Sequence, residues 1–365
     1  MNLADRTDSL RVERRALQVA GAGALAAVAL AWSDPGHFSL AWRFTVFAAL
    51  SPAVGCLLFV LIHRMTGGDW AVGLRPFLRA GVALLPWIWL LALPVLFFPD
   101  APGRAALPEG RSGGWGYASP AMIAVRAVAF AGVFFALSWA VGGDVGRDDE
   151  PRCNRRPWAG PAGMLVLVFM LTLLADDWIA SLEPGWHSTG FALVWMTGQA
   201  LAGLSLSLLG ALASGARPED AAANEPHRGI DWGNLLMAAL LSWCYVGFAQ
   251  FLIIWAENLP AEISWFAARQ RGPWFWVPPM LAVFGFLVPF LLLLSRRFKA
   301  TRRGLAAVAV TLLLSQGAYT AWLILPAAGP LSVAGWLLVL ALFVAGAGVF
   351  VNRFCRAARW GRVSE

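Results

Sequence analysis

The chain has 365 residues, of which 59% are hydrophobic and only 13% are charged. This balance excludes a large soluble domain, since such domains carry about 25% charged residues. The formal net charge of +7 would suggest a nucleic-acid partner in a soluble chain. Here the excess arginines lie in short segments between apolar stretches, so we expect anionic lipid headgroups, and no nucleic acid, to face them.

Ten apolar stretches follow one another, and each has about the 20 residues that a helix needs to cross a bilayer. They are residues 16–32, 42–63, 78–98, 120–142, 160–178, 189–213, 232–255, 275–294, 304–325 and 332–351. The first contains Ala29-Leu30-Ala31, which is similar to a signal-peptide cleavage site. Its apolar run is longer than a typical signal core, so we expect a retained helix. The sequence predicts an all-α integral membrane protein with ten transmembrane helices.

Positive charges are concentrated in every second connecting segment, and therefore on one side of the predicted membrane protein. When the connecting segments are assigned alternately, the side that holds both termini has 22 Arg and Lys residues and the other has 5, while Arg126 lies inside a helix. Arg and Lys accumulate on the cytoplasmic side of membrane proteins. The pattern therefore predicts that both termini are cytoplasmic.

Two pairs of motifs occur in the same order, 158 to 164 residues apart. The pairs are His63-Arg64…Asp69-Trp70 with His227-Arg228…Asp231-Trp232, and Pro120–Val125 with Pro278–Val283. They predict two four-helix units, helices 2–5 in residues 42–188 and helices 6–9 in residues 189–331. Residues 1–41 and 332–365 would hold the flanking helices 1 and 10. Since four spans is an even number, the units would form a parallel repeat about an axis along the bilayer normal.

The cysteines and histidines lack the spacing of metal ligands. No CxxC or CxxCH motif occurs, and no histidine lies well inside a span. We therefore expect this chain to bind no haem, iron–sulfur cluster or other metal of its own.

Two segments carry a family resemblance: DWIASLEPGWHST at 177–189 and QFLIIWAENLPAEISWF at 250–266. They resemble a signature of the NrfD/polysulfide-reductase-like membrane subunits of bacterial alternative complex III, a quinol:cytochrome c oxidoreductase. The match is closest to the ActF-type subunit and is strongest over about residues 170–300. The number of spans and the paired four-helix units fit the whole chain.

The resemblance implies a subunit of a respiratory chain complex in the bacterial inner membrane. Such subunits hold no redox centre: electrons pass to a periplasmic iron–sulfur protein, to multihaem cytochrome c subunits and then to an oxidase, for example a haem-copper oxidase. The quinol site is usually assigned to a paralogous membrane subunit. The resemblance thus leaves open whether this chain binds quinol, conducts protons or acts as an enzyme at all.

Arg126 is the residue that most needs explaining. It lies roughly 8–10 Å inside the fourth span, where an arginine costs about 2.5–3.5 kcal/mol and is normally paired. Asp176 and Asp177, at similar depth in the fifth span, are its expected partners. Two carboxyl groups beside one arginine could share a movable proton, as quinol oxidation requires. Alternatively, Arg126 extends to the outer headgroups and Asp177 caps the helix that follows.

Further candidates fall into two groups. The acidic loops on the expected periplasmic side either collect released protons or contact a periplasmic partner, and their candidates are Glu183, His187, Glu257 and Glu262. The lone His187 is better explained by a structural or interfacial role. Polar residues of the seventh span and its start either bond neighbouring helices or form a proton half-channel, and these are His227, Asp231, Ser242, Tyr245 and Gln250.

Two other classes of function stay open. Ten spans and an internal repeat also fit a secondary transporter, although no ionisable residue is expected near the middle of a span. A purely structural anchor for periplasmic subunits needs no site.

Overall fold

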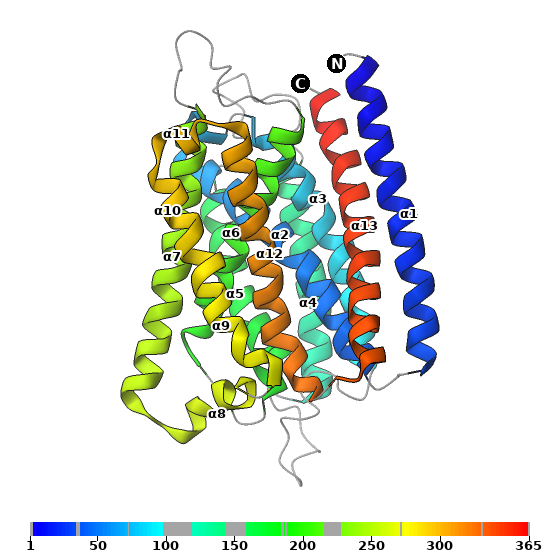
Figure 1. Cartoon of the computed structure of the whole chain (residues 1–365), viewed down its shortest axis with the longest axis vertical. Helices are drawn as coiled ribbons and strands as arrows, with labels where there is room; N and C mark the ends of the chain where they lie inside the picture. Colours follow the sequence, from blue (N-terminus) through cyan, green and yellow to red (C-terminus); the bar gives the residue numbers. More distant parts are fainter. Residues whose placement is uncertain are drawn as a thin grey trace.

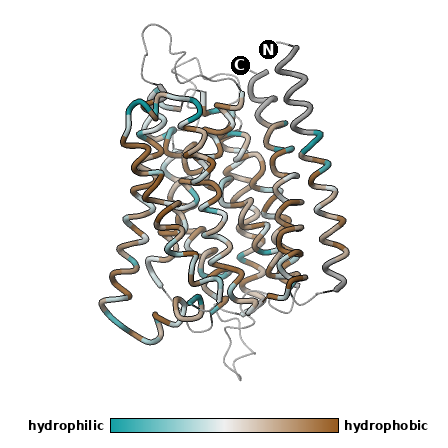
Figure 2. Tube along the Cα trace, viewed as in Figure 1, coloured by the Kyte–Doolittle hydropathy of each residue, from teal (hydrophilic) through white to brown (hydrophobic). Residues whose placement is uncertain are grey.

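The computed structural model describes residues 3–33, 37–71, 73–97, 119–142, 158–183, 186, 188–214, 228–270, 272–329 and 331–363. These residues form helices and short connections, without a strand among them. Nine helices in this part of the chain are long and apolar enough to cross a membrane. Figure 2 shows apolar residues along the length of these rods and hydrophilic residues mainly near their ends. The prediction of an all-α, multi-pass membrane protein is confirmed.

The elements in chain order are α1 (Leu3–Ser33), α2 (Phe38–Thr66), the 3-10 helix η2 (Asp69–Ala71), α3 (Arg75–Ala92), η3 (Leu93–Phe97), α4 (Pro120–Gly142), α5 (Ala159–Trp178), η4 (Ala180–Leu182), α6 (Phe191–Ala213), α7 (Arg228–Glu257), α8 (Pro260–Arg269), η5 (Gly272–Trp276), α9 (Val277–Met280), the π-helix η6 (Leu281–Leu287), α10 (Val288–Leu294), α11 (Arg296–Lys299), α12 (Arg302–Ile324), η7 (Leu325–Ala328) and α13 (Val333–Val363). The segment from η5 to α10 forms one span, Gly272–Leu294.

The two ends of the bundle differ in charge. The N-terminal end of α1, the C-terminal end of α13 and α11 all lie at one end (Figure 1). There α11 and the first turn of α12 contribute five cations: Arg296, Arg297, Lys299, Arg302 and Arg303. We call this the basic end, and the opposite one, where α8 lies, the α8 end. Successive spans run antiparallel, so α4 begins and α5 ends at the α8 end.

The first predicted span falls within α1, which is not among the nine spans because its side chains are described only for residues 14–29. Helix α1 runs along α13 (Figure 1), and small residues permit the close approach. A Cβ atom on Gly23 would lie 2.8 Å from the carbonyl oxygen of Ala341, and one on Gly348 would lie 2.6 Å from that of Ala16. Helix α1 thus has a fitted partner in the fold.

The centre of the bundle is the crossing of α2 and α6. Gly55 of α2 and Gly203 of α6 face each other so closely that a Cβ atom on either would overlap the backbone of the other. These two spans are the most deeply buried of the nine. Helices α4 and α7 and the span Gly272–Leu294 lie at the periphery and leave most of their apolar surface exposed.

Candidate functional site

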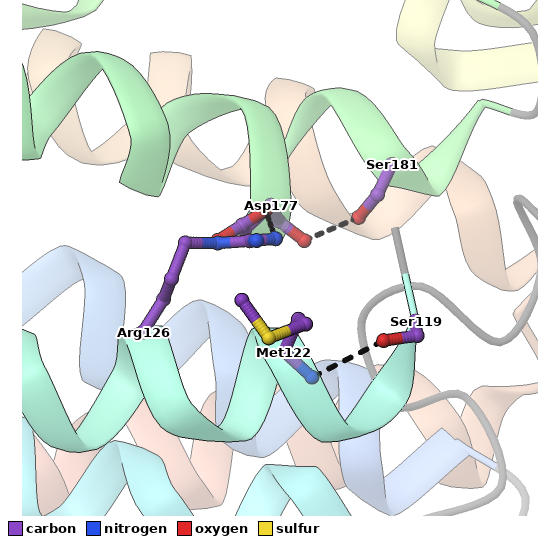
Figure 3. Close-up of polar contacts among 5 residues, drawn as sticks. All are labelled: Ser119, Met122, Arg126, Asp177 and Ser181. Atoms are coloured by element: carbon purple, nitrogen blue, oxygen red, sulfur yellow. Dashed lines mark hydrogen bonds and ion pairs between the residues drawn. The ribbon is translucent and has the colours of Figure 1, made fainter. Parts of the chain in front are cut away.

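Arg126 of α4 and Asp177 of α5 form a bidentate ion pair near the α8 end (Figure 3). The guanidinium Nε donates to Oδ2 at 2.7 Å, and Nη2 donates to Oδ1 at 2.6 Å. The side chains are 12% and 3% exposed, respectively. Hydrogen bonds between two charged groups are about twice as strong as neutral ones. The predicted pairing is confirmed, and Arg126 does not extend away to the surface.

Local hydrogen bonds fix the helix ends that carry this pair. Ser119 caps the start of α4, where its Oγ accepts a 3.3 Å hydrogen bond from the backbone N–H of Met122. At the end of α5, Ser181 donates a 2.6 Å hydrogen bond to the backbone carbonyl of Asp177 (Figure 3). No side chain caps the following helix, η4. The alternative that Asp177 caps this helix is therefore wrong, because its carboxylate is bonded to Arg126.

An aromatic cluster contacts the residues that follow the ion pair on both helices. Trp178, next to Asp177, is fully buried, and its ring lies 5.0 Å from that of Trp89. The Trp89 indole donates a 2.8 Å hydrogen bond to the carbonyl of Ala127, the residue after Arg126. Apolar walls strengthen an enclosed electrostatic interaction by excluding water. The cluster therefore ties both members of the pair to the core.

The chemistry available to this site is ion pairing and proton exchange. Arginine stays protonated at any physiological pH, so only carboxyl groups can exchange a proton here. Asp176 is half-buried and precedes Asp177, which places a second carboxyl group at nearly the same depth. One fixed cation and two carboxyl groups therefore occupy the α8 end of the α4–α5 pair.

A second cluster joins the two acidic loops. The indole of Trp186 stacks on Trp265 with ring centroids 4.4 Å apart and donates a 3.0 Å hydrogen bond to the carbonyl of Glu262. The guanidinium carbon of Arg269 lies 3.2 Å from the centroid of the Trp265 ring, a cation–π contact. The cluster fixes α8 against the loop that follows η4.

Sequence reasoning missed Arg269, which it counted among the loop charges. Its side chain is only 2% exposed and donates to the carbonyls of Trp265, Trp322 and Leu323 at 2.9, 3.1 and 2.8 Å. Two of these carbonyls lie in the last turn of α12, where a cation is favourable. Burial lowers the pKa of Arg269 to about 9, and the negative charge of Glu183 acts in the opposite direction. Arg269 therefore stays charged at neutral pH.

The other acidic candidates are spread over the α8 end. Glu183 is half-buried and close enough to Arg269 to act on it electrostatically. Glu262 is half-buried, whereas Glu257 is exposed at the end of α7. Asp231 is exposed in the first turn of α7, at the basic end. His187 and His227 lie outside the described residues.

Among the described residues of the suggested half-channel, Ser242 and Tyr245 do not face the interior of the bundle. Ser242 is exposed and donates to the carbonyl of Ala238 in its own helix at 2.8 Å, and Tyr245 is 74% exposed. Gln250 instead donates to the Oγ of Ser188 at 3.0 Å. Gln250 thus bonds another segment, whereas Ser242 and Tyr245 lie on the outer side of α7.

No family model and no curated protein matches this chain. Within the described ranges, no group of three or more His, Cys, Asp or Glu residues could hold a metal ion. The features that bear on function are the ion pair, the joined loops and the resemblance of those loops.

Proposed function

We propose that this chain is a membrane subunit of a quinol-oxidising respiratory complex of the alternative complex III type. In this proposal, Arg126 and Asp177 support quinol oxidation at the membrane face, and the loops of the α8 end hold the periplasmic iron–sulfur and multihaem cytochrome c subunits. A paralogous membrane subunit would complete the quinol site, and a haem-copper oxidase would receive the electrons. The chain itself would bind no haem or cluster.

The observation that carries the proposal is the meeting of the two segments that resemble the family. They are far apart in the sequence, yet Trp186 of the first bonds to and stacks on the second, 76 residues away. Gln250 of the second bonds to Ser188 of the first. Together they form a single carboxylate-bearing surface at the end opposite the basic residues. Such a surface suits a docked periplasmic subunit.

The same proposal includes ten spans and cytoplasmic termini. With α1 as the tenth span, the basic end faces the cytoplasm, as the positive-inside rule requires. The α8 end then faces the periplasm, and Arg126 and Asp177 lie close to that side. The carboxyl group of Asp177, close to the periplasmic side of the membrane, could then accept protons released by quinol oxidation.

We also propose that helices 2–5 and 6–9 are parallel repeats. The matched residues Trp70 and Trp232 lie in contact, because the Trp232 indole donates a 3.1 Å hydrogen bond to the Trp70 carbonyl. The first helices of the two units, α2 and α6, cross at Gly55 and Gly203. Contacts between matched positions are expected close to a symmetry axis, which supports the repeat.

The first experiment is purification of the tagged chain from its own membranes in mild detergent. Co-purification of haem-absorbing, iron–sulfur-containing subunits is expected, with quinol:cytochrome c oxidoreductase activity. Isolation of the chain alone, with solute uptake after reconstitution, would reject the proposal in favour of a secondary transporter.

The second experiment tests the site within the assembled complex. Arg126→Leu and Asp177→Asn should each lower turnover by roughly 100-fold, as for loss of a positioned proton-transfer group. Arg297→Leu, an exposed arginine of the basic end, is the matched control and should leave turnover unchanged. Normal turnover of both site variants in a fully assembled complex would leave a structural anchor as the better description.

A further inference from the structure

Lys299 of α11 is a buried cation that no carboxylate of the described residues neutralises. The residue is 5% exposed, and its Nζ donates a 2.6 Å hydrogen bond to Oδ1 of Asn234, a neutral amide on α7. The aliphatic part of the side chain packs over Gly233, where a Cβ atom would lie 2.6 Å from Cδ of Lys299. A lysine is almost never buried to this extent unless its charge is paired. The fold therefore holds in place a positive charge that an anion would stabilise.

A second cation acts on Lys299. Burial lowers the pKa of Lys299, and the positive charge of Arg296 lowers it further. Arg296 and Lys299 are three residues apart and share one side of the helical turn, whereas Arg297 faces another side. Asp231 is exposed in the first turn of the neighbouring α7, but no ion pair of the described residues joins it to either cation. We call Arg296, Lys299 and Asn234 the α11 site, which combines two cations with a neutral amide.

Two exposed apolar stripes run along the spans toward the α11 site. On η6 and α10 the stripe consists of Leu287, Leu291 and Leu294, which are exposed at helical spacing and end just before α11. On α7, Leu241 is exposed about two turns from Asn234 and on the same face. Helix α11 packs against both α10 and α7, and Figure 1 shows it at the upper end of these helices. Acyl chains that lie along both stripes would therefore bring their headgroup to the α11 site.

We propose that the α11 site binds the phosphate group of an anionic phospholipid whose acyl chains lie along the two stripes. The phosphate oxygens would accept hydrogen bonds from the guanidinium group of Arg296 and from Nζ of Lys299, which has three donors and uses one for Asn234. Basic pockets between membrane helices are suited to anionic headgroups. A free phosphate ion would leave the stripes uncovered, whereas a neutral lipid would leave the charge of Lys299 unbalanced.

This inference goes beyond the proposed respiratory role. Binding at the α11 site needs neither the Arg126–Asp177 pair nor a partner subunit, and it is independent of the side of the membrane on which the basic end lies. It also differs from a diffuse attraction of lipid to all cations of the basic end. Diffuse attraction would depend on Arg296 and Arg297 alike, whereas the α11 site depends on Arg296.

Arg296→Gln and Arg297→Gln therefore form a matched pair of variants. Both arginines are exposed, and they are consecutive residues of α11. Arg296→Gln removes a charged donor to the phosphate and should weaken lipid binding by about tenfold or more. Arg297→Gln removes the same charge from another side of the turn and should have little effect.

Asn234→Asp provides an independent test of the role of Lys299. The substitution would place a carboxylate on the 2.6 Å hydrogen bond to Nζ and would neutralise the lysine from within the chain. Because the phosphate would then meet a nearby negative charge, lipid binding should weaken by about tenfold. The free energy of unfolding should not fall, since the shape of the side chain is kept and the buried cation gains a partner.

The assay is saturable binding of radiolabelled dioleoylphosphatidylglycerol to the purified full chain in detergent, after removal of native lipid. Dioleoylphosphatidylcholine, which has the same acyl chains and no net charge, should not displace the probe at equal concentration. Glycerophosphoglycerol, which is the headgroup without acyl chains, should not displace it either. All variants should elute as the parent does in size-exclusion chromatography.

Four results would overturn the inference. The first is a lack of saturable binding by the parent chain. The second is displacement of the probe by an equal concentration of dioleoylphosphatidylcholine, which would show an acyl-chain surface without selectivity for charge. The third is displacement by glycerophosphoglycerol, which would show a site for soluble phosphate esters. The fourth is unchanged binding by Arg296→Gln or Asn234→Asp, or equal weakening by Arg296→Gln and Arg297→Gln.

Discussion

Removal of one member of the Arg126–Asp177 pair should be far more damaging than removal of both. Arg126→Leu leaves the carboxylate of Asp177, whose side chain is 3% exposed, without either of its guanidinium bonds. The loss of one partner of a buried ion pair typically costs about 3–5 kcal/mol. The double variant Arg126→Leu/Asp177→Leu buries no charge, so it should lie within about 1 kcal/mol of the parent. The expected coupling energy is therefore about 3 kcal/mol or more.

This prediction is measured by unfolding the purified chain with SDS in mixed micelles, followed by circular dichroism. The four proteins of the cycle are compared at one pH and one detergent composition. Arg297→Leu, at an exposed position of the basic end, should change the free energy of unfolding by less than about 0.5 kcal/mol. A loss below 1 kcal/mol for Arg126→Leu, or additive losses in the double variant, would refute the assignment of a buried, mutually dependent pair.

Three further predictions concern the packing of the bundle. Arg269→Met should lower the free energy of unfolding by about 3 kcal/mol, measured in the same SDS titration, because the last carbonyls of α12 lose their charged donor. Gly203→Val should lower the free energy of unfolding by at least about 3 kcal/mol, because the new side chain would overlap the backbone of α2. Gly132→Val, at a position with open space, should have little effect. Equal losses for the two variants would contradict the close crossing of α2 and α6. Gly23→Leu should separate α1 from α13 and expose α1 to limited proteolysis, while protection equal to that of the parent would show that the two helices do not pack there.

The spans could be predicted from the sequence because a helix that crosses a bilayer must have a minimum length and an apolar composition. Residues 189–213 and 304–325 were expected, and α6 and α12 occupy Phe191–Ala213 and Arg302–Ile324. The pairing of Arg126 was predictable for a similar reason. A charge at that depth needs a partner, and depth along neighbouring spans can be estimated from residue counts.

Features that depend on how the helices are arranged side by side, and on which face of each helix meets the core, could not be predicted. Arg269 was assigned to a connecting segment, yet it is buried, because tertiary neighbours enclose it. Ser242 and Tyr245 were considered for an internal path but lie on the outer side of α7. A helix that is apolar on all sides gives no periodic signal for the face that meets the core.

The proposed repeat gives a reason to assign the ion pair a role beyond packing. In that repeat, the position of Arg126 corresponds to Phe284, which lies in η6 and is 52% exposed. The same place would therefore hold a buried ion pair in the first unit and an exposed, uncharged phenylalanine in the second. Because the second unit forms its span without any charge there, the scaffold does not require one. A buried arginine that the proposed repeat does not require, and that insertion into the bilayer opposes, is what we expect if it holds the carboxyl group of the proposed function in place.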